Sequence, residues 1–282
     1  MCGRSKRLLQ SFGTSDLDPD FGVPEWVSKS LSPFFCYYGG KWRAAPRYPT
    51  PQHDTIIEPF AGAAGYATRY HDRQVILVER DPVIAELWRY LIRVSSDEIR
   101  ALPDMPRDGS TTDDLPISAA ARSLIGFWIN KGSATPRKSP SSWMLTIGHN
   151  ARPNSHWGPV IREKLASQVT AIRHWQVIEG SYEQAPEVPA TWFIDPPYQV
   201  AGKHYRHGLV DYAALATWCQ ARSGQVMVCE QWGANWLPFK PFRTIKTNPS
   251  SRGKASSAEA LWQNETRGDL FDLLRLVDNG HS

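Results

Sequence analysis

Short apolar runs rich in β-branched and aromatic residues recur along the chain and predict the buried strands of an α/β sheet. Between them, amphipathic patterns predict helices, one entered just after Gly65 and two over residues 83–94 and 211–222. Alternating strands and helices favour a largely parallel sheet covered on both faces. The expected strands are residues 55–58, 74–79, 176–182, 191–195 and 225–230, followed by a final hairpin over 242–247 and 259–263.

The alternation breaks between residues 95 and 174, which are rich in Pro, Ser, Asn, Gly and Arg and carry helical patterns near 117–130 and 159–173. Long structureless stretches are uncommon in compact domains unless they are functional, which favours an inserted, mainly helical subdomain over an irregular loop. The expected organisation is a loosely ordered extension, a main domain in two parts and an insertion, covering residues 1–33, 34–94 with 175–282, and 95–174.

The chain has 282 residues, of which 41% are hydrophobic and 21% charged, as is typical of a globular protein. No apolar run approaches the roughly 20 residues of a membrane span, and no signal-type apolar core follows the basic N-terminus. We therefore expect a cytoplasmic protein without a membrane partner. The four cysteines form no CxxC pair and no zinc-like spacing with histidines, which predicts reduced thiols, at least two of them in the core.

Positive charge is concentrated in two stretches of the chain. Residues 115–175 hold eight Lys or Arg residues and one acid, Glu163, a formal charge of +7 against +4 for the whole chain, and a second basic run covers 240–254. Cations interleaved with aromatic and amide side chains suit nucleic acid, and a solvated basic surface is an equal alternative. The candidate DNA-binding residues are Arg122, Asn130, Lys131, Arg137, Lys138, Asn150, Arg152, Arg252 and Lys254.

The predicted strand that begins at Thr191 ends abruptly in Asp195, Pro196, Pro197 and Tyr198. Proline lacks the N–H that a sheet ladder needs, so the strand stops at Asp195. Its carboxylate then lies at the carboxyl end of a strand, where open α/β sheets bind ligands. The two prolines stiffen the backbone beyond it, and Tyr198 adds an aromatic face.

Two other predicted strands also end in acids. Residues 58–62 turn through small residues that allow close approach to a ligand, but they lack the GxGxxG spacing that cradles a diphosphate. This argues against NAD and for an adenosine cofactor without a diphosphate. Glu79 follows Gly62 by 17 residues, where an acid can accept hydrogen bonds from ribose hydroxyls. A simple ion pair with Arg80 or a surface lysine is the alternative for Glu79.

A glycine pair and a lysine stand further upstream, in Tyr37-Tyr38-Gly39-Gly40-Lys41. Glycines let the backbone approach a ligand closely, and the lysine supplies a cation. Taken alone, a Gly-Gly turn before a surface lysine is the commoner explanation of this pattern.

Four motifs in this order resemble those of Dam-like DNA adenine methyltransferases: Tyr-Tyr-Gly-Gly-Lys at 37–41, Glu-Pro-Phe-Ala-Gly at 58–62, Glu-Arg-Asp-Pro at 79–82 and Asp-Pro-Pro-Tyr at 195–198. The resemblance covers about residues 33–264. It implies a Rossmann-like, seven-stranded methyltransferase sheet with S-adenosylmethionine at its strand ends and a target-recognition insertion before the catalytic strand. It also implies double-stranded DNA as substrate, a bacterial or phage setting, and a monomer or weak dimer, with or without a cognate restriction endonuclease as partner.

The resemblance also implies roles for individual residues. Tyr37 and Lys41 would flank the cofactor's methionine portion and the catalytic site, Glu79 would hold the ribose, and Ser181 and Tyr182 fall where the family contacts the adenine, although an acid is usual at the Ser181 position. The candidate cofactor-binding residues are Tyr37, Tyr38, Gly40, Lys41, Glu58, Pro59, Phe60, Ala61, Gly62, Glu79, Asp81, Ser181, Tyr182 and Asp195, and the candidate catalytic residues are Asp195, Pro196, Pro197 and Tyr198.

The chemistry of an adenine amino group fits these residue types. The lone pair of the amino nitrogen is delocalised into the ring. Two acceptors for its N–H groups, here Asp195 and the carbonyl of Pro196, localise that lone pair toward a methyl donor. No metal is needed for this step. Tyr198 can stack on the base once it has left the duplex. No cysteine follows a proline, which argues against methylation at carbon 5 of cytosine. The cytosine amino group, adenine in RNA, and a non-catalytic nucleic-acid-binding protein on this scaffold are the alternatives.

Overall fold

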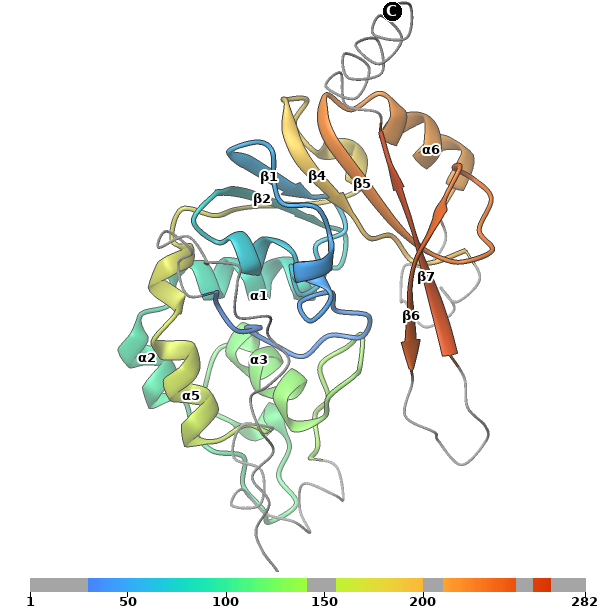
Figure 1. Ribbon diagram of the computed structural model, residues 1–282. Helices are drawn as coiled ribbons and strands as arrows, with labels where there is room; N and C mark the ends of the chain where they lie inside the picture. Colours follow the sequence, from blue (N-terminus) through green and yellow to red (C-terminus); the bar gives the residue numbers. More distant parts are fainter. Residues whose placement is uncertain (1–29, 141–155, 200–209, 247–255, 265–282) are drawn as a thin grey trace, which may run out of the picture.

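The computed structural model describes residues 30–140, 156–199, 210–246 and 256–264, and its strands form one seven-stranded sheet in the order β3-β2-β1-β4-β5-β7-β6 (Figure 1). The predicted α/β class, the seven-stranded sheet and the final hairpin are confirmed. The strands are β1 (Thr55–Glu58), β2 (Gln74–Glu79), β3 (Gln176–Glu179), β4 (Ala190–Ile194), β5 (Gly224–Gln231), β6 (Lys240–Lys246) and β7 (Ser256–Gln263).

The order of the strands creates a switch point between β1 and β4. Strands β3, β2, β1, β4 and β5 are mutually parallel, whereas β7 is antiparallel to both β5 and β6. The chain builds outward from β1 to β3 in one direction and from β4 to β5 in the other. In open α/β sheets the crevice at such a reversal, outside the carboxyl ends of the strands, binds ligands. Glu58 and Asp195 lie at the two strand ends that flank it.

Helices cover both faces of the sheet because neighbouring strand residues point to opposite sides. Ile56, Phe193 and Met227 belong to the larger hydrophobic cluster, which also holds α1 (Pro82–Arg93). Their chain neighbours Ile57, Trp192 and Val226 belong to the second cluster, together with α6 (Tyr212–Gln220). Figure 1 shows α1 and α6 on opposite sides of the strands.

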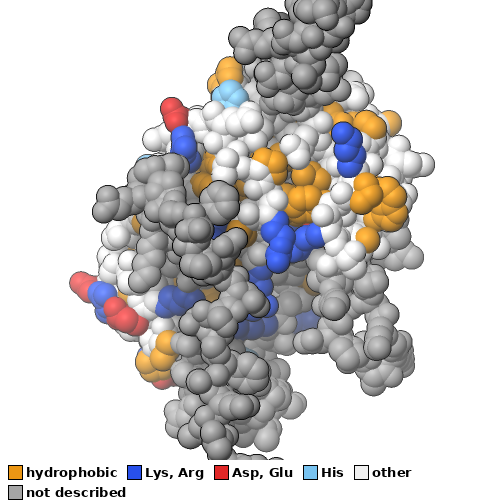
Figure 2. Space-filling model, in the orientation of Figure 1, with side chains coloured by type: hydrophobic (Ala, Val, Ile, Leu, Met, Phe, Trp, Pro, Cys, Tyr) orange, Lys and Arg blue, Asp and Glu red, His pale blue; other side chains and the backbone are white. Residues whose placement is uncertain are grey.

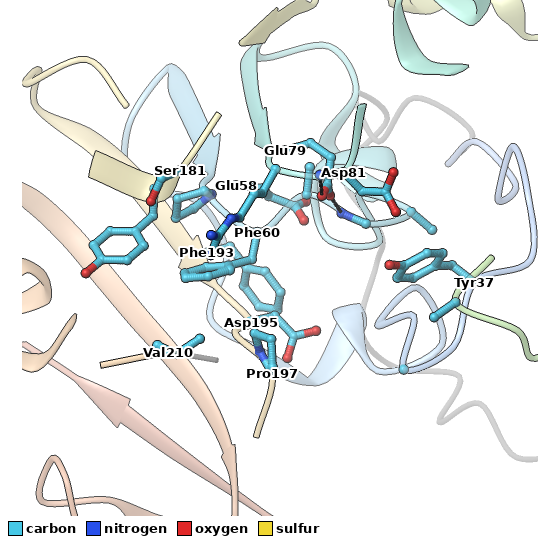
Figure 3. Close-up of a pocket in the computed structure, with 18 of the residues that line it drawn as sticks. Tyr37, Glu58, Phe60, Glu79, Asp81, Ser181, Phe193, Asp195, Pro197 and Val210 are labelled. Carbon is cyan, nitrogen blue, oxygen red and sulfur yellow. Dashed lines mark hydrogen bonds between the residues drawn. The ribbon is translucent and has the colours of Figure 1, made fainter. Parts of the chain in front are cut away.

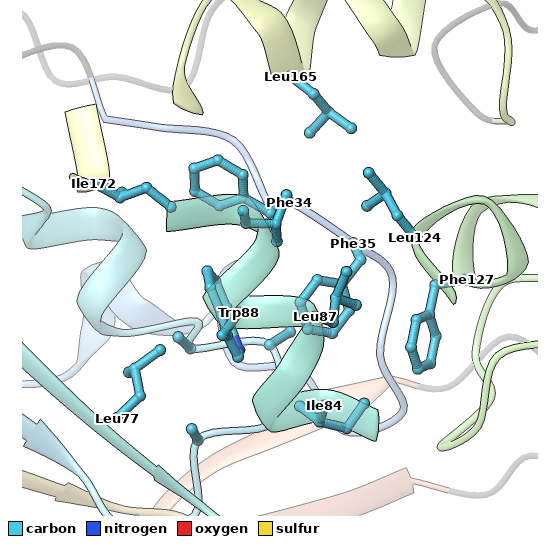
Figure 4. Packing of buried hydrophobic residues seen from close by; sticks show 14 of the residues in the cluster. Phe34, Phe35, Leu77, Ile84, Leu87, Trp88, Leu124, Phe127, Leu165 and Ile172 are labelled. Atoms are coloured by element: carbon cyan, nitrogen blue, oxygen red, sulfur yellow. The ribbon is translucent and has the colours of Figure 1, made fainter. Parts of the chain in front are cut away.

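Helix α1 links the core to the turn that follows β1. Asp81 caps its N-terminus by accepting from the N–H of Val83 at 2.9 Å, and Pro82 occupies the first helical position. Trp88 is fully buried, and its ring contacts Phe34 and Phe35 at centroid distances of 5.7 and 5.4 Å (Figure 4). Its Nε1 donates to the carbonyl of Gly62 at 2.8 Å. The core therefore holds in place the turn at residues 58–62, which the sequence predicts to approach a cofactor.

Helices from residues 95–174 join this same cluster. Leu124, Phe127 and Leu165 are fully buried beside α1 (Figure 4). The helical pattern near 117–130 is confirmed, and the pattern near 159–173 forms a shorter α-helix followed by a 3-10 turn. Among its described residues, this stretch contains α2 (Ser96–Ala101), α3 (Ala119–Ile129), α5 (Pro159–Ala166) and 3-10 turns at Thr112–Asp114 and Val169–Ile172.

The prediction of a helix after Gly65 was wrong. A 3-10 turn forms in its place, at Ala67–Tyr70, and β2 begins at Gln74. Similar 3-10 turns lie at Ala45–Arg47 and Tyr182–Gln184. Cys219 and Cys229 are buried free thiols, which confirms that at least two cysteines lie in the core. In the described ranges, no helix has the length and apolarity needed to cross a bilayer.

Candidate active site

A cavity of about 510 Å³ opens at the carboxyl ends of the parallel strands (Figure 3). This volume falls in the range of small-molecule sites. All fourteen residues of the predicted cofactor site line it, although they come from five separate stretches of the chain. In Figure 3, Ser181 and Tyr37 lie on opposite sides of the cavity, with Glu79 at one edge and Asp195 and Pro197 at the other.

The Glu79 carboxylate anchors the turn that follows β1. Its Oε2 accepts from the N–H of Gly62 at 2.8 Å, and its Oε1 accepts from the N–H of Asp81 at 2.9 Å. Burial raises the pKa of Glu79, while these N–H donors oppose the rise. Among the described residues, Glu79 forms no ion pair with Arg80 or with a lysine, which was the alternative explanation for this acid. Each carboxylate oxygen retains a lone pair that can accept from a ligand hydroxyl.

Gly62 is a glycine for two local reasons. Its φ is +45°, a conformation that favours glycine, and an added Cβ would lie 3.1 Å from the ring of Tyr37. The ring of Tyr37 therefore lies directly over the turn. Across the cavity, the rings of Phe60 and Tyr182 stack with centroids 5.5 Å apart and form an apolar wall.

Lys41 and Asp195 form an ion pair that joins two distant motifs. Nζ of Lys41 donates to both carboxylate oxygens of Asp195, at 2.8 and 2.7 Å, and the two side chains are 7% and 18% exposed. Burial works against the charge of Lys41, but the attraction of Asp195 outweighs it and raises the pKa of Lys41. Lys41 is therefore not the surface lysine of the alternative explanation.

The two prolines and Tyr198 differ in their position relative to the cavity. Pro197 lines it, whereas Pro196 and Tyr198 are not among its lining residues. Tyr198 is partly buried against the larger core cluster, and Nζ of Lys41 lies 5.0 Å from the centroid of its ring. Its hydroxyl is buried and has no hydrogen-bond partner among the residues that the structure describes, and burial raises its pKa well above the usual value.

These groups define what the cavity can bind. Carboxylates at the ends of β1, β2 and β4 provide acceptors for hydroxyl and amino groups, and the stacked wall offers an apolar surface to a flat ring. Neither a family model nor a curated protein sequence matches this chain, so its own residues carry the functional interpretation. Within the described ranges, no cluster of three His, Cys, Asp or Glu residues could hold a metal ion.

The predicted DNA-binding residues lie in varied settings, and none of those in the described part of the chain lines the cavity. Arg122 donates to the backbone carbonyl of Leu115 at 3.0 Å, and Lys138 is paired with Asp113. Asn130 is half-buried at the end of α3, while Lys131 and Arg137 are exposed. The remaining candidates lie outside the described residues: Asn150, Arg152, Arg252 and Lys254.

Several lining residues were missed by the sequence prediction. Some are neighbours of the motifs and could have been found by widening them by one position. Ala134, Val210, Asp211 and Ala214 come from loops and from the start of α6, and no local signal marks them as part of a cavity. The missed lining residues are Gly39, Ala63, Arg80, Ala134, Gly180, Glu183, Phe193, Val210, Asp211 and Ala214.

Glu58 is expected to make the ligand-free protein less stable as the pH rises. It is 2% exposed, and burial raises its pKa to about 8 from 4.5, even though its Oε1 accepts from the N–H of Ala67. Between these two values the unfolded chain ionises while the folded protein stays protonated. Stability is therefore full below pH 4.5 and falls up to pH 8, by as much as about 1.4 kcal/mol for each unit between the two pKa values.

Urea unfolding of Glu58→Gln and of the wild type at pH 5 and pH 9 tests this expectation. The glutamine keeps an oxygen for the N–H of Ala67 but does not ionise, so the variant should gain stability relative to the wild type at pH 9. Glu187→Gln, at an 83% exposed side chain, is the matched control and should not change the pH dependence. An equal loss of stability between pH 5 and 9 in Glu58→Gln and in the wild type would contradict the prediction.

Proposed function

We propose that this protein transfers a methyl group from S-adenosylmethionine to the exocyclic amino group of a flipped adenine in duplex DNA. One observation carries the proposal. Residues from five separate stretches, including all four motifs of the methyltransferase resemblance, line one cavity beside the switch point of the sheet, and Asp195 is among them. An α/β sheet alone would not support an activity, because one fold hosts many functions.

The lining residues fit S-adenosylmethionine. Glu79 would accept from the ribose hydroxyls, Phe60 and Tyr182 would contact the adenine, and the turn at Gly62 lets the ligand approach the backbone. The turn also lacks the glycine spacing of a diphosphate site, in keeping with a cofactor that carries none. When bound, S-adenosylmethionine would supply an electrophilic methyl group on a sulfonium sulfur; the S–CH₃ bond breaks as the N–CH₃ bond forms, S-adenosylhomocysteine is the leaving group, and the methylated amino group loses one proton.

Asp195 and the carbonyl of Pro196 would accept the two N–H groups of the amino nitrogen. Burial raises the pKa of Asp195, and the attraction of Lys41 opposes that rise, so Lys41 favours the ionised carboxylate and orients it. Each carboxylate oxygen offers about two lone-pair sites, so Asp195 can accept an amino N–H and remain paired with Lys41. An ionised Asp195 also stabilises the positive charge that develops on the amino nitrogen as it gains a methyl group.

Tyr198 would contribute an aromatic contact to the target base. Stacking of a base on an aromatic ring is worth about 1–3 kcal/mol, which helps to offset the cost of unstacking it from the duplex. Because Tyr198 packs beside Lys41 at the edge of the core, its ring is held next to Asp195. Residues 200–209, which follow this segment in the chain, lie outside the described residues.

The loop after α3 offers a path for the DNA backbone next to the cavity. It carries the exposed Lys131 and Arg137, and Ala134 between them lines the cavity. The N–H of Tyr38 donates to the carbonyl of Ser133 at 3.2 Å, which fastens the loop to the cavity rim. Figure 2 shows Lys and Arg side chains gathered on one face of the molecule beside apolar ones. Cations of this kind bind phosphates without reading sequence.

Incubation with methyl-labelled S-adenosylmethionine and duplex DNA, followed by identification of the modified nucleoside, tests the proposal directly. We expect N6-methyladenine in the DNA. Label on the cytosine amino group, or on adenine in RNA but not in DNA, would mean that the substrate is a different base or nucleic acid. The proposed amino-group chemistry would still hold. Binding of nucleic acid without binding of S-adenosylmethionine would instead support a non-catalytic protein on this scaffold.

A further inference from the structure

The backbone on both sides of Tyr198 is anchored by side chains that do not line the cavity. The hydroxyl of Tyr212 donates to the carbonyl of Pro197 at 2.8 Å. The N–H of Gln199 donates to Oε1 of Glu230 at 2.8 Å. Tyr212 is the first residue of α6 and Glu230 lies near the end of β5, so two different elements hold the segment that leaves β4.

Trp236 connects these two anchors. Its Nε1 donates to the same Oε1 of Glu230 at 3.1 Å, and its ring packs against the ring of Tyr212 with centroids 5.5 Å apart. The contacts form a closed circuit from Pro197 through Tyr212, Trp236 and Glu230 to Gln199. Tyr198 lies between the two ends of this circuit. We call the side chains of Tyr212, Trp236 and Glu230 the brace.

Glu230 is suited to this position as a carboxylate. It is fully buried, and its Oε2 accepts from the N–H of Gln231 at 2.6 Å. Three N–H donors thus converge on one side chain, which matches a carboxylate because a carboxylate only accepts hydrogen bonds. Burial raises the pKa of Glu230, and the same three donors oppose that rise.

We propose that Tyr212 and Glu230 are positioning residues, which anchor the backbone at Pro197 and Gln199 and so fix the Pro196 carbonyl and the Tyr198 ring relative to Asp195. This inference rests on the proposed function. The proline rings fix the φ angles of residues 196 and 197 and disfavour the α region for the residue before each ring, but they do not restrict the chain beyond Pro197, whose course needs other anchors. A displacement on the order of 1 Å in a reaction governed by positioning can cost roughly 100-fold in rate.

Tyr212→Phe tests the brace by deleting one hydroxyl while keeping the ring against Trp236. We expect kcat to fall about tenfold or more, with the Kd for S-adenosylmethionine within about twofold of the wild type. Glu230→Gln places an amide NH₂ among N–H donors and should cause a similar loss. The double variant should lose less than the product of the two single effects, because both side chains act on one segment.

Tyr66→Phe is the matched control for loss of a buried hydroxyl. The Tyr66 hydroxyl also donates to a proline carbonyl, that of Pro49, at 2.7 Å, and Tyr66 does not line the cavity. We expect this control to keep the wild-type kcat. A kcat for Tyr212→Phe close to that of the wild type, or an equal fall in Tyr66→Phe, would overturn the inference.

Amide hydrogen exchange at Gln199 separates this inference from the proposed function. The N–H of Gln199 should exchange faster in Tyr212→Phe and in Glu230→Gln than in the wild type, whether or not methyl transfer is detected. Unchanged exchange in both variants means that the brace does not anchor the segment. A wild-type protein that methylates no nucleic acid contradicts the proposed function, and faster exchange would then still support the anchoring.

Discussion

Replacing Asp195 with alanine is expected to abolish methyl transfer while S-adenosylmethionine still binds. The substitution removes one of the two acceptors for the amino group and the negative charge beside the developing cation, and we expect kcat to fall by at least about 10³-fold. The residues that would hold the cofactor, Glu79, Phe60 and Tyr182, come from other strand ends and keep their contacts. Single-turnover rates and equilibrium binding of labelled S-adenosylmethionine, measured on the same preparation, check both halves of the prediction.

A stability effect must be separated from this loss of activity. Asp195→Ala leaves the buried ammonium of Lys41 without its carboxylate, and breaking a buried pair in this way typically costs about 3–5 kcal/mol. The double variant Asp195→Ala with Lys41→Met removes both charges and should recover most of that stability without recovering transfer. Near-normal turnover in the folded Asp195→Ala variant would show that Asp195 is not the acceptor for the amino group.

Replacing Gly65 with alanine is expected to destabilise the protein strongly and to disturb the site from outside it. An added Cβ at Gly65 would lie 2.5 Å from the backbone N of Trp42 and 2.9 Å from two backbone atoms of Lys41. Backbone cannot turn aside as a flexible side chain can, so the segment that carries Lys41 must shift away from Gly65, which disturbs the pairing of Lys41 with Asp195. We expect a loss of about 3 kcal/mol or more in unfolding free energy, at the upper end for overpacking, together with a large loss of kcat.

Gly132→Ala is the matched control for this substitution. Its φ is +81° and none of the described residues has an atom within 4 Å of the added Cβ, so it carries only the backbone penalty of roughly 1 kcal/mol. Urea unfolding of the two variants side by side separates conformational strain from steric overlap. If Gly65→Ala is no more destabilising than Gly132→Ala, the backbone at Lys41 and Trp42 does not pack tightly against Gly65.

Local patterns were sufficient to predict the sheet and the acids at its strand ends. The strand at 74–79 was predicted with its full bounds, and the strand ending near Asp195 was predicted to within one residue. Both depend on properties that neighbouring residues carry, namely β-branched apolar runs and prolines that cannot continue a ladder. The same reasoning failed after Gly65, where a 3-10 turn at Ala67–Tyr70 forms in place of the expected helix.

The number of basic residues along a stretch of sequence indicated the possible DNA-binding surface less well than the positions and partners of those residues in the structure. Residues 115–175 contain a single acid, yet Lys138 is paired with Asp113 and Arg162 with Asp104, acids that lie outside the stretch. Arg122 donates to a backbone carbonyl. Lys131 and Arg137 keep exposed side chains on the loop that reaches the cavity. Tertiary contacts therefore reduce a broad basic window to a few cations near the site.

The sequence by itself determined which residue types stand at the ends of the strands, because strand formation and its interruption are local. Only the tertiary structure decided how these residues combine. Lys41 and Asp195 are 154 residues apart, and they meet because the sheet order places β1 beside β4. The anchors at Tyr212 and Glu230 depend in the same way on α6 and β5 flanking β4, since contacts between distant segments follow from topology and packing rather than from any local pattern.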